Sequence, residues 1–364
     1  MKEYLASSKL SPIELAKHLM VFKSSADTKK DFEQIIKSLV SEDQTERVGQ
    51  IIRGLEQEDE FAILCKLMGT CESISKVGQS PIIDTDEIAP DFIASFSPGC
   101  SVSGKEKEDI NLKYQCFIEV KSSKNKIFKI SARDLKRRKK FSSRFKLPLI
   151  FAVRFTMFEG HGIWVLVDSS KLAKSGRRIE VSDFIGNLNH VLFDDYGVYT
   201  HPNLYVAHYY DSNFEGPGIT HGDHGALDRT VFLFPDEPSI VVDENDQVLV
   251  NAFLDNFEFK QVKVERESNI TCVISSVGSQ SRFLSDILFF VNHLAIDEYG
   301  ETSFDASRAI ARMDSKDNSI PLVGREMIEY VMQMMNSKKE MFFKIAMGKP
   351  ETQERILHNL KKHR

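Results

Sequence analysis

The sequence predicts an α/β fold in which a mostly buried sheet follows N-terminal helices and precedes a β-rich region and a helical region. Three observations predict it. Apolar residues recur at helical spacing between residues 12 and 68. Short apolar runs then follow at 90–96, 114–121, 149–155 and 163–167, and a strongly basic segment interrupts them at 131–146. Strands that alternate with helices in this way are typical of a sheet buried between helical layers.

The composition bounds the kind of protein. A chain of 364 residues with 41% hydrophobic residues is long enough for two or three domains. We expect four regions: N-terminal helices at 1–54, the main α/β core at 55–184, a β-rich accessory region at 185–280, and a helical C-terminal region at 281–364. The chain has neither an apolar run long enough for a membrane span nor a basic-then-apolar N-terminus, so neither a membrane protein nor a signal peptide is expected. Its five cysteines are dispersed, without a CxxC pair, which indicates reduced thiols in a cytoplasmic protein.

The N-terminal helices can be placed one by one. Pro12 suits the first turn of a helix, and residues 31–40 and 41–68 repeat apolar side chains at helical spacing. Gly49 and Gly54 lie inside the last segment, so one long helix and two shorter ones both fit it. Gly69 is suited to end that segment as a C-cap.

The second half of the chain shows weaker patterns. Strands are expected at 230–234, 239–242, 247–250 and 271–275, and helices at 283–294 and 323–347. His201, His208, His221 and His224 fall in a glycine-containing stretch whose spacing matches no metal site, so we interpret it as a polar loop. Tyr205, Tyr209 and Tyr210 in the same stretch could stack on bases, although a buried sheet face suits them better. No Walker motif is present, so ATP hydrolysis is not expected.

Charge is distributed very unevenly along the chain. The net charge is −5, yet residues 121–146 contain twelve Lys or Arg against the single acid Asp134, a local charge of +11. The rest of the chain therefore carries −16. A local positive field on an acidic body is the layout expected of a nucleic-acid groove, and a solvated basic helix face is the alternative.

One set of residues can carry chemistry. Asp91 begins one predicted strand, and Glu119 and Lys121 end the next. Residues i and i+2 of a strand point to the same face, so Glu119 and Lys121 share a face with the carbonyl of Val120 between them. If the two strands pair as a hairpin, Asp91 meets Glu119. Two carboxylates and a carbonyl form a hard, all-oxygen site that suits Mg²⁺ or Mn²⁺, which can polarise a phosphodiester and activate water.

The segments Pro90-Asp91 and Glu119-Val120-Lys121 resemble the two halves of the motif of the PD-(D/E)xK nuclease superfamily, which includes restriction endonucleases and archaeal-type Holliday-junction resolvases. The resemblance covers about residues 55–170. It implies an α-β-β-β-α-β core, with residues 128–130 as the third strand, and an acid on the first helix that helps hold the metal or its water. Glu58 is the candidate for that acid, and Glu60 is its rival. The 28 residues between Asp91 and Glu119 exceed the usual gap, which implies an enlarged loop near 97–113.

The resemblance implies a metal-dependent nuclease that acts on DNA, restriction-like or phage-defence-like in role, with Asp91, Glu119, Lys121 and Glu58 at its centre. RNA remains open as a substrate, and a nuclease fold kept as an idle binding scaffold is the alternative. A homodimer or a partner subunit also remains open. Two arginines four apart, Arg308 and Arg312, could meet DNA or belong to a packed bundle. The residues expected to bind nucleic acid are Lys124, Lys126, Lys129, Arg133, Lys136, Arg137, Arg138, Lys139 and Lys140.

Overall fold

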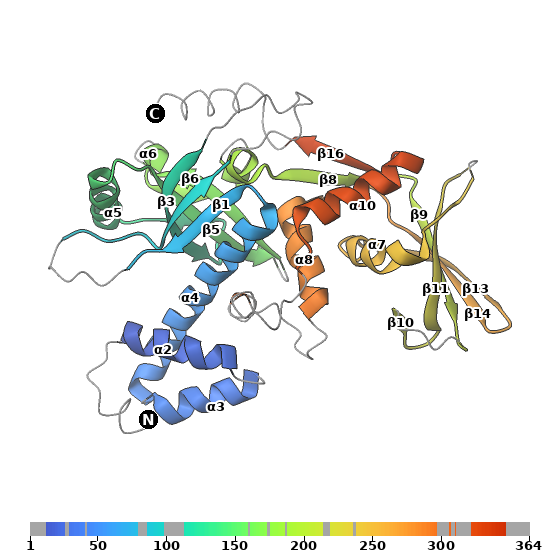
Figure 1. Ribbon diagram of the computed structural model, residues 1–364, viewed down its shortest axis with the longest axis horizontal. Helices are drawn as coiled ribbons and strands as arrows, with labels where there is room; N and C mark the ends of the chain where they lie inside the picture. Colours follow the sequence, from blue (N-terminus) through green and yellow to red (C-terminus); the bar gives the residue numbers. More distant parts are fainter. Residues whose placement is uncertain are drawn as a thin grey trace. The chain divides into compact units, whose positions relative to one another are not determined.

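The computed structural model shows a mixed α/β protein (Figure 1). It describes residues 12–25, 29–40, 42–78, 86–97, 113–158, 161–172, 175–185, 188–213, 219–235, 238–296, 306, 310 and 322–346. The chain divides into two compact units. The first is built on Met1–Asp194, and the second combines Asp195–Leu294 with Val323–Met347. The second unit therefore contains residues from both the predicted β-rich region at 185–280 and the predicted helical region at 281–364. None of the helices in the described part of the chain is long and apolar enough to span a membrane.

Three helices begin the first unit: α2 (Pro12–Ser25), α3 (Lys29–Leu39) and α4 (Glu42–Met68). Figure 1 shows α2 and α3 beside the N-terminal half of α4, where they share a small core that includes Leu19, Phe32 and Val48. The structure resolves the two alternatives for α4, because one helix of 27 residues continues through both glycines. It ends at Gly69, whose φ of 71° fits the predicted C-cap.

The main sheet of this unit has five strands in the order β1-β2-β3-β5-β6. Their bounds are β1 Cys71–Lys76, β2 Phe92–Phe96, β3 Tyr114–Ser123, β5 Leu149–Phe158 and β6 His161–Asp168. Strands β3 and β5 are parallel, and the other neighbours are antiparallel. The parallel pair is possible because helix α5 (Ala132–Arg144) provides the crossover between them.

Helices cover both faces of this sheet. Phe61 of α4 is fully buried, and its ring lies 6.4 Å from that of Phe92 and 5.1 Å from that of Trp164. On the other face, Phe117 of β3 contacts Phe141 of α5 at 5.4 Å between ring centroids. Phe61 therefore anchors α4 to the sheet three residues after Glu58, and truncating it to alanine should cost about 3–5 kcal/mol of stability.

The predicted third strand at 128–130 is not part of the main sheet. The short strand β4 (Ile127–Lys129) pairs instead with β7 (Arg178–Glu180) in a separate ribbon. The main sheet instead gains β1, which comes before β2 in the chain and pairs with it at the edge of the sheet. The half-exposed sequence of β1, CESISK, lacks the apolar alternation that identifies a strand. The order helix, three strands, helix, strand is thus supplied by α4, β1, β2, β3, α5 and β5. Two short helices, α6 (Ser169–Leu172) and the 3-10 turn Val181–Phe184, and a π-helical turn, Asn189–Phe193, complete the described part of this unit.

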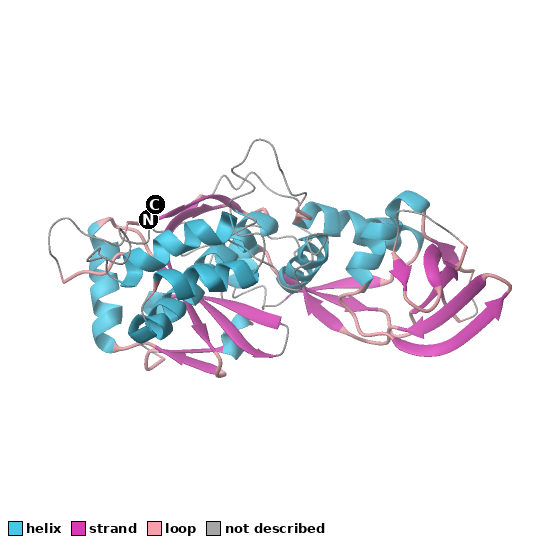
Figure 2. Cartoon of the chain, turned by 90° about the horizontal axis from the view of Figure 1, so that it is seen from below, coloured by secondary structure: helices cyan, strands magenta, loops and turns pink. Residues whose placement is uncertain are grey.

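The second unit contains an antiparallel sheet in the order β10-β11-β9-β14-β13, with β12 added to β11. Its strands are β9 Tyr205–Asp211, β10 Thr220–His221, β11 Gly225–Leu233, β12 Ile240–Val241, β13 Lys260–Glu267 and β14 Ile270–Ser276. A smaller sheet joins β15 (Ser281–Phe283), β8 (Tyr196–Thr200) and β16 (Phe342–Ala346). Figure 2 shows the helices of this unit gathered on one side of its strands: α7 Gln247–Leu254, α8 Leu284–Ile296 and α10 Arg325–Lys338.

Two predictions for this unit are wrong. Residues 247–250 begin helix α7 rather than a strand, because Val250, Phe253 and Leu254 bury one helical stripe. The predicted helix at 323–347 ends with α10 at Lys338, and strand β16 follows it. The predicted strands at 230–234, 239–242 and 271–275 overlap β11, β12 and β14, and the helix at 283–294 is α8. The enlarged loop, apart from its ends, and Arg308 and Arg312 lie outside the described residues.

Candidate active site

The paired strands β2 and β3 bring the two halves of the predicted motif together. Phe92 pairs with Ile118 in the antiparallel register, so Asp91, one residue earlier, lies beside Glu119. The Oδ2 atom of Asp91 accepts a hydrogen bond of 2.7 Å from the backbone N–H of Val120. Both carboxylates are buried, with Asp91 6% and Glu119 1% exposed. The antiparallel pairing of β2 with β3, on which the predicted contact of Asp91 with Glu119 depends, is therefore present.

The amino group of Lys121 lies among the oxygens of this site. Its Nζ donates to the carbonyl of Val120 at 2.7 Å, contacts Oε1 of Glu119, and lies 3.9 Å from Oδ2 of Asp91. Two carboxylates and one carbonyl thus converge on a single cationic group of the chain itself. An ammonium held in this way marks a position where oxygen atoms already favour positive charge.

The oxygens present fit a hard divalent cation. Among the described residues, Oε2 of Glu119 is buried and has no hydrogen-bond partner. Within the same residues, no three side chains of His, Cys, Asp or Glu are arranged as a metal cluster, so the carbonyl of Val120 has to count as a ligand. A free buried carboxylate oxygen beside a second carboxylate and a carbonyl suits Mg²⁺ or Mn²⁺, which prefer oxygen and retain several waters.

The surroundings of Asp91 change its protonation. Burial, together with the neighbouring charge of Glu119, raises the pKa of Asp91 to about 6, and the charge of Lys121 opposes the shift. Two carboxylates this close cannot both ionise cheaply unless a cation lies between them. Lys121, which lies near both carboxylates, supplies such a cation from the chain itself.

Of the two candidate acids on α4, Glu58 is the one that the site influences. Burial raises its pKa to about 8, and the charge of Asp91 contributes to the same shift. Glu60 instead accepts from the indole of Trp164 at 3.3 Å and lies 2.6 Å from Nε of Arg154. The charge of Asp91 thus acts on Glu58, whereas Glu60 forms a separate ion pair with Arg154.

One basic side chain of α5 reaches the site, which the sequence did not reveal. A terminal nitrogen of Arg138 lies 2.7 Å from Oε1 of Glu119, and only 13% of the Arg138 side chain is exposed. A signal for this was available, because Leu135 and Ser142 are the buried residues of α5 and Arg138 follows Leu135 by three. Arg138 was predicted to bind nucleic acid, and its side chain lies on the inner face of the helix against Glu119.

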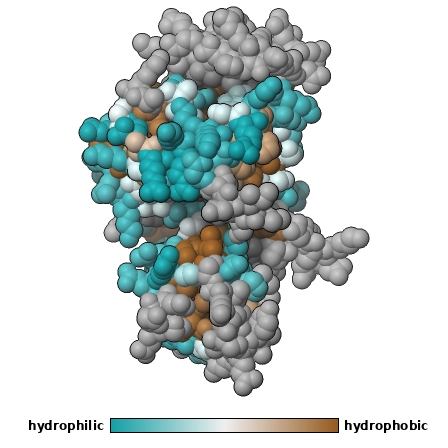
Figure 3. Space-filling view, turned by 90° about the vertical axis from the view of Figure 1, so that its left-hand side faces the viewer, coloured by the Kyte–Doolittle hydropathy of each residue, from teal (hydrophilic) through white to brown (hydrophobic). Residues whose placement is uncertain are grey.

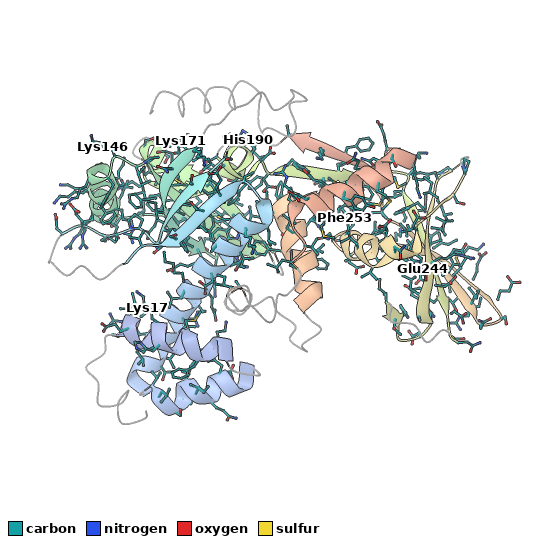
Figure 4. The ribbon with its side chains drawn as sticks, in the orientation of Figure 1. Lys17, Lys146, Lys171, His190, Glu244 and Phe253 are labelled. Atoms are coloured by element: carbon teal, nitrogen blue, oxygen red, sulfur yellow. The ribbon has the colours of Figure 1, made fainter. Side chains whose placement is uncertain are left out.

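The other predicted nucleic-acid-binding residues fall into two groups. Arg137 donates to the carbonyl of Asp86 at 2.6 Å, and Lys140 contacts the carboxylate of Asp86 at 2.6 Å. The remaining six have no ion pair with any described residue: Lys124, Lys126, Lys129, Arg133, Lys136 and Lys139. Figure 3, which looks from the side where α5 lies in Figure 1, shows a mostly hydrophilic surface there, and Figure 4 shows Lys146 at the end of the basic segment.

The histidine-rich stretch of the second unit has a different character. The rings of His221 and His224 stack at 4.3 Å, and Tyr210 lies 5.4 Å from His221. Nε2 of His208 donates to the amide oxygen of Asn251 at 2.9 Å. Among the described residues, no three potential ligands gather as a metal cluster.

No family model matches this chain, and no curated protein matches it. Among solved structures, the chain is similar to Hjc, a Holliday junction resolvase from Archaeoglobus fulgidus. The sequence identity is 17% and the TM-score is 0.26, over 36% of this chain and 91% of the resolvase chain. At this identity and score the similarity says nothing about the chemistry of the site, whose assignment rests on the contacts described above.

Proposed function

We propose that this protein is a metal-dependent nuclease of the PD-(D/E)xK type that hydrolyses phosphodiester bonds in DNA. One observation supports the proposal above all others. Asp91, Glu119 and the carbonyl of Val120 surround the ammonium of Lys121, and a second oxygen of Glu119 is buried without a hydrogen-bond partner among the described residues. An oxygen site of this kind, with a lysine beside it, has the groups needed for phosphodiester hydrolysis.

Each residue has a role in this proposal. Asp91, Glu119 and the carbonyl of Val120 would hold Mg²⁺ or Mn²⁺, which when bound polarises the phosphodiester and lowers the pKa of water. Lys121 would leave these oxygens and use its ammonium to orient the water or to neutralise charge on the phosphate. Glu58, whose pKa is about 8, keeps its proton at neutral pH in the metal-free protein and becomes ionised once a positive charge lies beside it.

The exposed basic residues support binding of the substrate. Lys124, Lys126, Lys129, Arg133 and Lys136 are exposed and follow the site directly in the chain. Contacts of such residues with phosphates release counterions, so binding should weaken steeply as the salt concentration rises. DNA is proposed as the substrate because the motif resembles that of DNA nucleases. A restriction-like or phage-defence-like role follows from the same resemblance.

The proposal is tested by incubating the purified protein with supercoiled, linear and single-stranded DNA and with RNA, in Mg²⁺, Mn²⁺ or EDTA. Lys121→Ala and Asp91→Ala are tested beside the native chain. We expect cleavage that needs the metal and is lost in both variants. Cleavage that persists in both variants would mean that the site is misassigned or that the activity comes from a contaminant. Preferred cleavage of RNA would correct the substrate.

A catalytically idle nucleic-acid-binding or interaction scaffold is the second candidate. It is favoured by the fact that Glu119 is contacted by two cationic side chains, Lys121 and Arg138, so the chain can balance that charge without a metal. Binding of Mn²⁺, measured by calorimetry, distinguishes the nuclease from the scaffold, because an idle scaffold does not need to keep a metal site. Salt-sensitive DNA binding without cleavage or metal binding would favour the scaffold.

A further inference from the structure

Arg138 has a position that a DNA-binding surface does not explain. Its side chain is 13% exposed, and it crosses from α5 to Glu119, which is 1% exposed. Its Nε is buried and has no hydrogen-bond partner among the described residues. A terminal nitrogen of Arg138 therefore contacts a buried carboxylate, while its Nε–H donor has no acceptor among the described residues.

Glu119 already has two cationic side chains, Lys121 and Arg138, on its Oε1 atom. A divalent ion bound to its Oε2 atom would add like charge beside them and would weaken their hold on this carboxylate. A guanidinium that loses its carboxylate while still buried is costly and needs another anion. In a nuclease the anion that arrives at this place is a phosphate of the substrate, and the planar fork of Arg matches phosphate geometry.

We propose that Arg138 is a positioning residue that holds Glu119 in the metal-free protein, competes with the divalent ion for it, and then turns to a phosphate of the substrate. This inference rests on the proposed nuclease function and adds to it a mechanism that couples metal binding to substrate binding. Such coupling is reciprocal, so an anion that takes over Arg138 strengthens metal binding, and the metal strengthens substrate binding.

The neighbouring arginine provides a matched control. Arg137 lies one position earlier on the same helix, but its Nε donates to the carbonyl of Asp86 rather than to Glu119. Changing Arg137 to Gln removes the same charge from α5 without touching the carboxylates of the site. Changing Arg138 to Lys keeps the charge beside Glu119 and removes the planar fork.

The test is calorimetric titration of the full chain with Mn²⁺ alone, for the native protein, Arg138→Gln, Arg138→Lys and Arg137→Gln. We expect Arg138→Gln to bind Mn²⁺ about tenfold more tightly, because a competing buried charge is gone. Arg138→Lys and Arg137→Gln should stay within about threefold of the native protein, since neither removes the charge beside Glu119. The direction of the change in Mn²⁺ affinity distinguishes competition from orientation. If Arg138 only oriented Glu119, its removal would weaken metal binding.

The outcomes separate this inference from the proposed function. If Arg138→Gln binds Mn²⁺ as tightly as the native protein or more weakly, Arg138 does not compete with the metal for Glu119. Mn²⁺ binding by the native protein would still support the proposed function. Binding that appears only in Arg138→Gln supports the competition and points to an idle native chain. No binding in any variant overturns both. With metal saturating, KM for DNA should rise about tenfold in Arg138→Gln, and an unchanged KM would overturn the phosphate contact.

Discussion

The two units each bury an aspartate, and the partners of the two differ. Asp195 of the second unit is 2% exposed, and Ser285 donates to it through its hydroxyl at 2.7 Å and its backbone N–H at 3.2 Å. The backbone N–H of Tyr196 adds a third bond at 3.0 Å. In the first unit, Asp91 lies beside a second buried carboxylate, Glu119. Lys121 lies near both carboxylates, and Arg138 contacts Glu119. One acid is held by neutral donors, and the other belongs to a charged group.

This difference teaches what a shifted pKa does and does not indicate. Burial raises the pKa of Asp91 and that of Asp195 alike, each to about 6. The number alone therefore does not identify a site. Asp195 accepts hydrogen bonds from Ser285 at the start of α8 and acts as a cap. In the Asp91–Glu119 pair, two carboxylates lie side by side, and Oε2 of Glu119 has no hydrogen-bond partner among the described residues. Only the second arrangement calls for a ligand.

The largest predicted effect separates the two aspartates by activity. Asp91→Asn removes a proposed metal ligand and should lower metal-dependent DNA cleavage by about 1000-fold or more. Asp195→Asn should leave the rate within about threefold, because its contacts stabilise the second unit rather than the site. Initial cleavage rates at saturating Mg²⁺ measure both. Equal losses in the two variants would remove the distinction drawn between them.

The sequence predicted the charged group because its members are close in the chain or fixed by strand geometry. Glu119 and Lys121 follow from the period of two, and Asp91 follows from its place at the start of the neighbouring strand. Arg138 and Asp86 could not be assigned in this way. Arg137 contacts Asp86 from 51 residues away and Lys140 from 54, so these contacts exist only once α5 has packed.

The errors in the fold have a similar cause. Strand β1 has almost no apolar alternation, and it is a strand because β2 offers it an edge to pair with. Residues 247–250 have the β-branched content of a strand, yet the side chain of Asn251 bonds to Thr230 and the apolar stripe of α7 faces the core. Tertiary pairing decided both segments against their local pattern.

The second predicted effect concerns pH and Glu58. Its pKa is about 8 in the folded chain and near 4.5 in the unfolded chain, so the folded state binds the extra proton between these values. In EDTA, stability should therefore fall as the pH rises through this window and level off above it. Glu58→Gln should remove the part of this slope that Glu58 contributes and gain about 2–4 kcal/mol at pH 9, measured by urea unfolding at pH 5, 7 and 9.

Glu60→Gln is the matched control for that experiment. It lies two residues further along α4 and is also buried, but it pairs with Arg154. Burial raises the pKa of Glu60 as well, but its replacement leaves the arginine without a partner carboxylate, so the gain in stability at high pH should be smaller than for Glu58→Gln. A native stability curve that stays flat between pH 5 and 9 in EDTA would contradict the assignment of Glu58 to the charged site.

A smaller effect tests the structural role of Asp195. Asp195→Ala removes the acceptor of the N–H and hydroxyl of Ser285 at the beginning of α8 and of the N–H of Tyr196 at the beginning of β8. The free energy of unfolding should fall by about 1–2 kcal/mol, as for the loss of a helix cap. Urea unfolding at pH 7 measures it, with the rate of cleavage at low temperature as the control for the site. An unchanged urea midpoint would show that Asp195 is dispensable for the second unit.

The smallest effect concerns the basic surface of the first unit, where two lysines of α5 differ only in their partners. Lys136 has no ion pair with any described residue, whereas Lys140 contacts the carboxylate of Asp86 at 2.6 Å. Lys136→Ala should weaken DNA binding by about 0.5–1 kcal/mol and lower the slope of log K against log salt by about 0.9. Lys140→Ala should do less, because its charge is already balanced by Asp86. Fluorescence anisotropy at several salt concentrations measures both slopes, and a larger loss for Lys140 would mean that Asp86 releases this lysine when DNA binds.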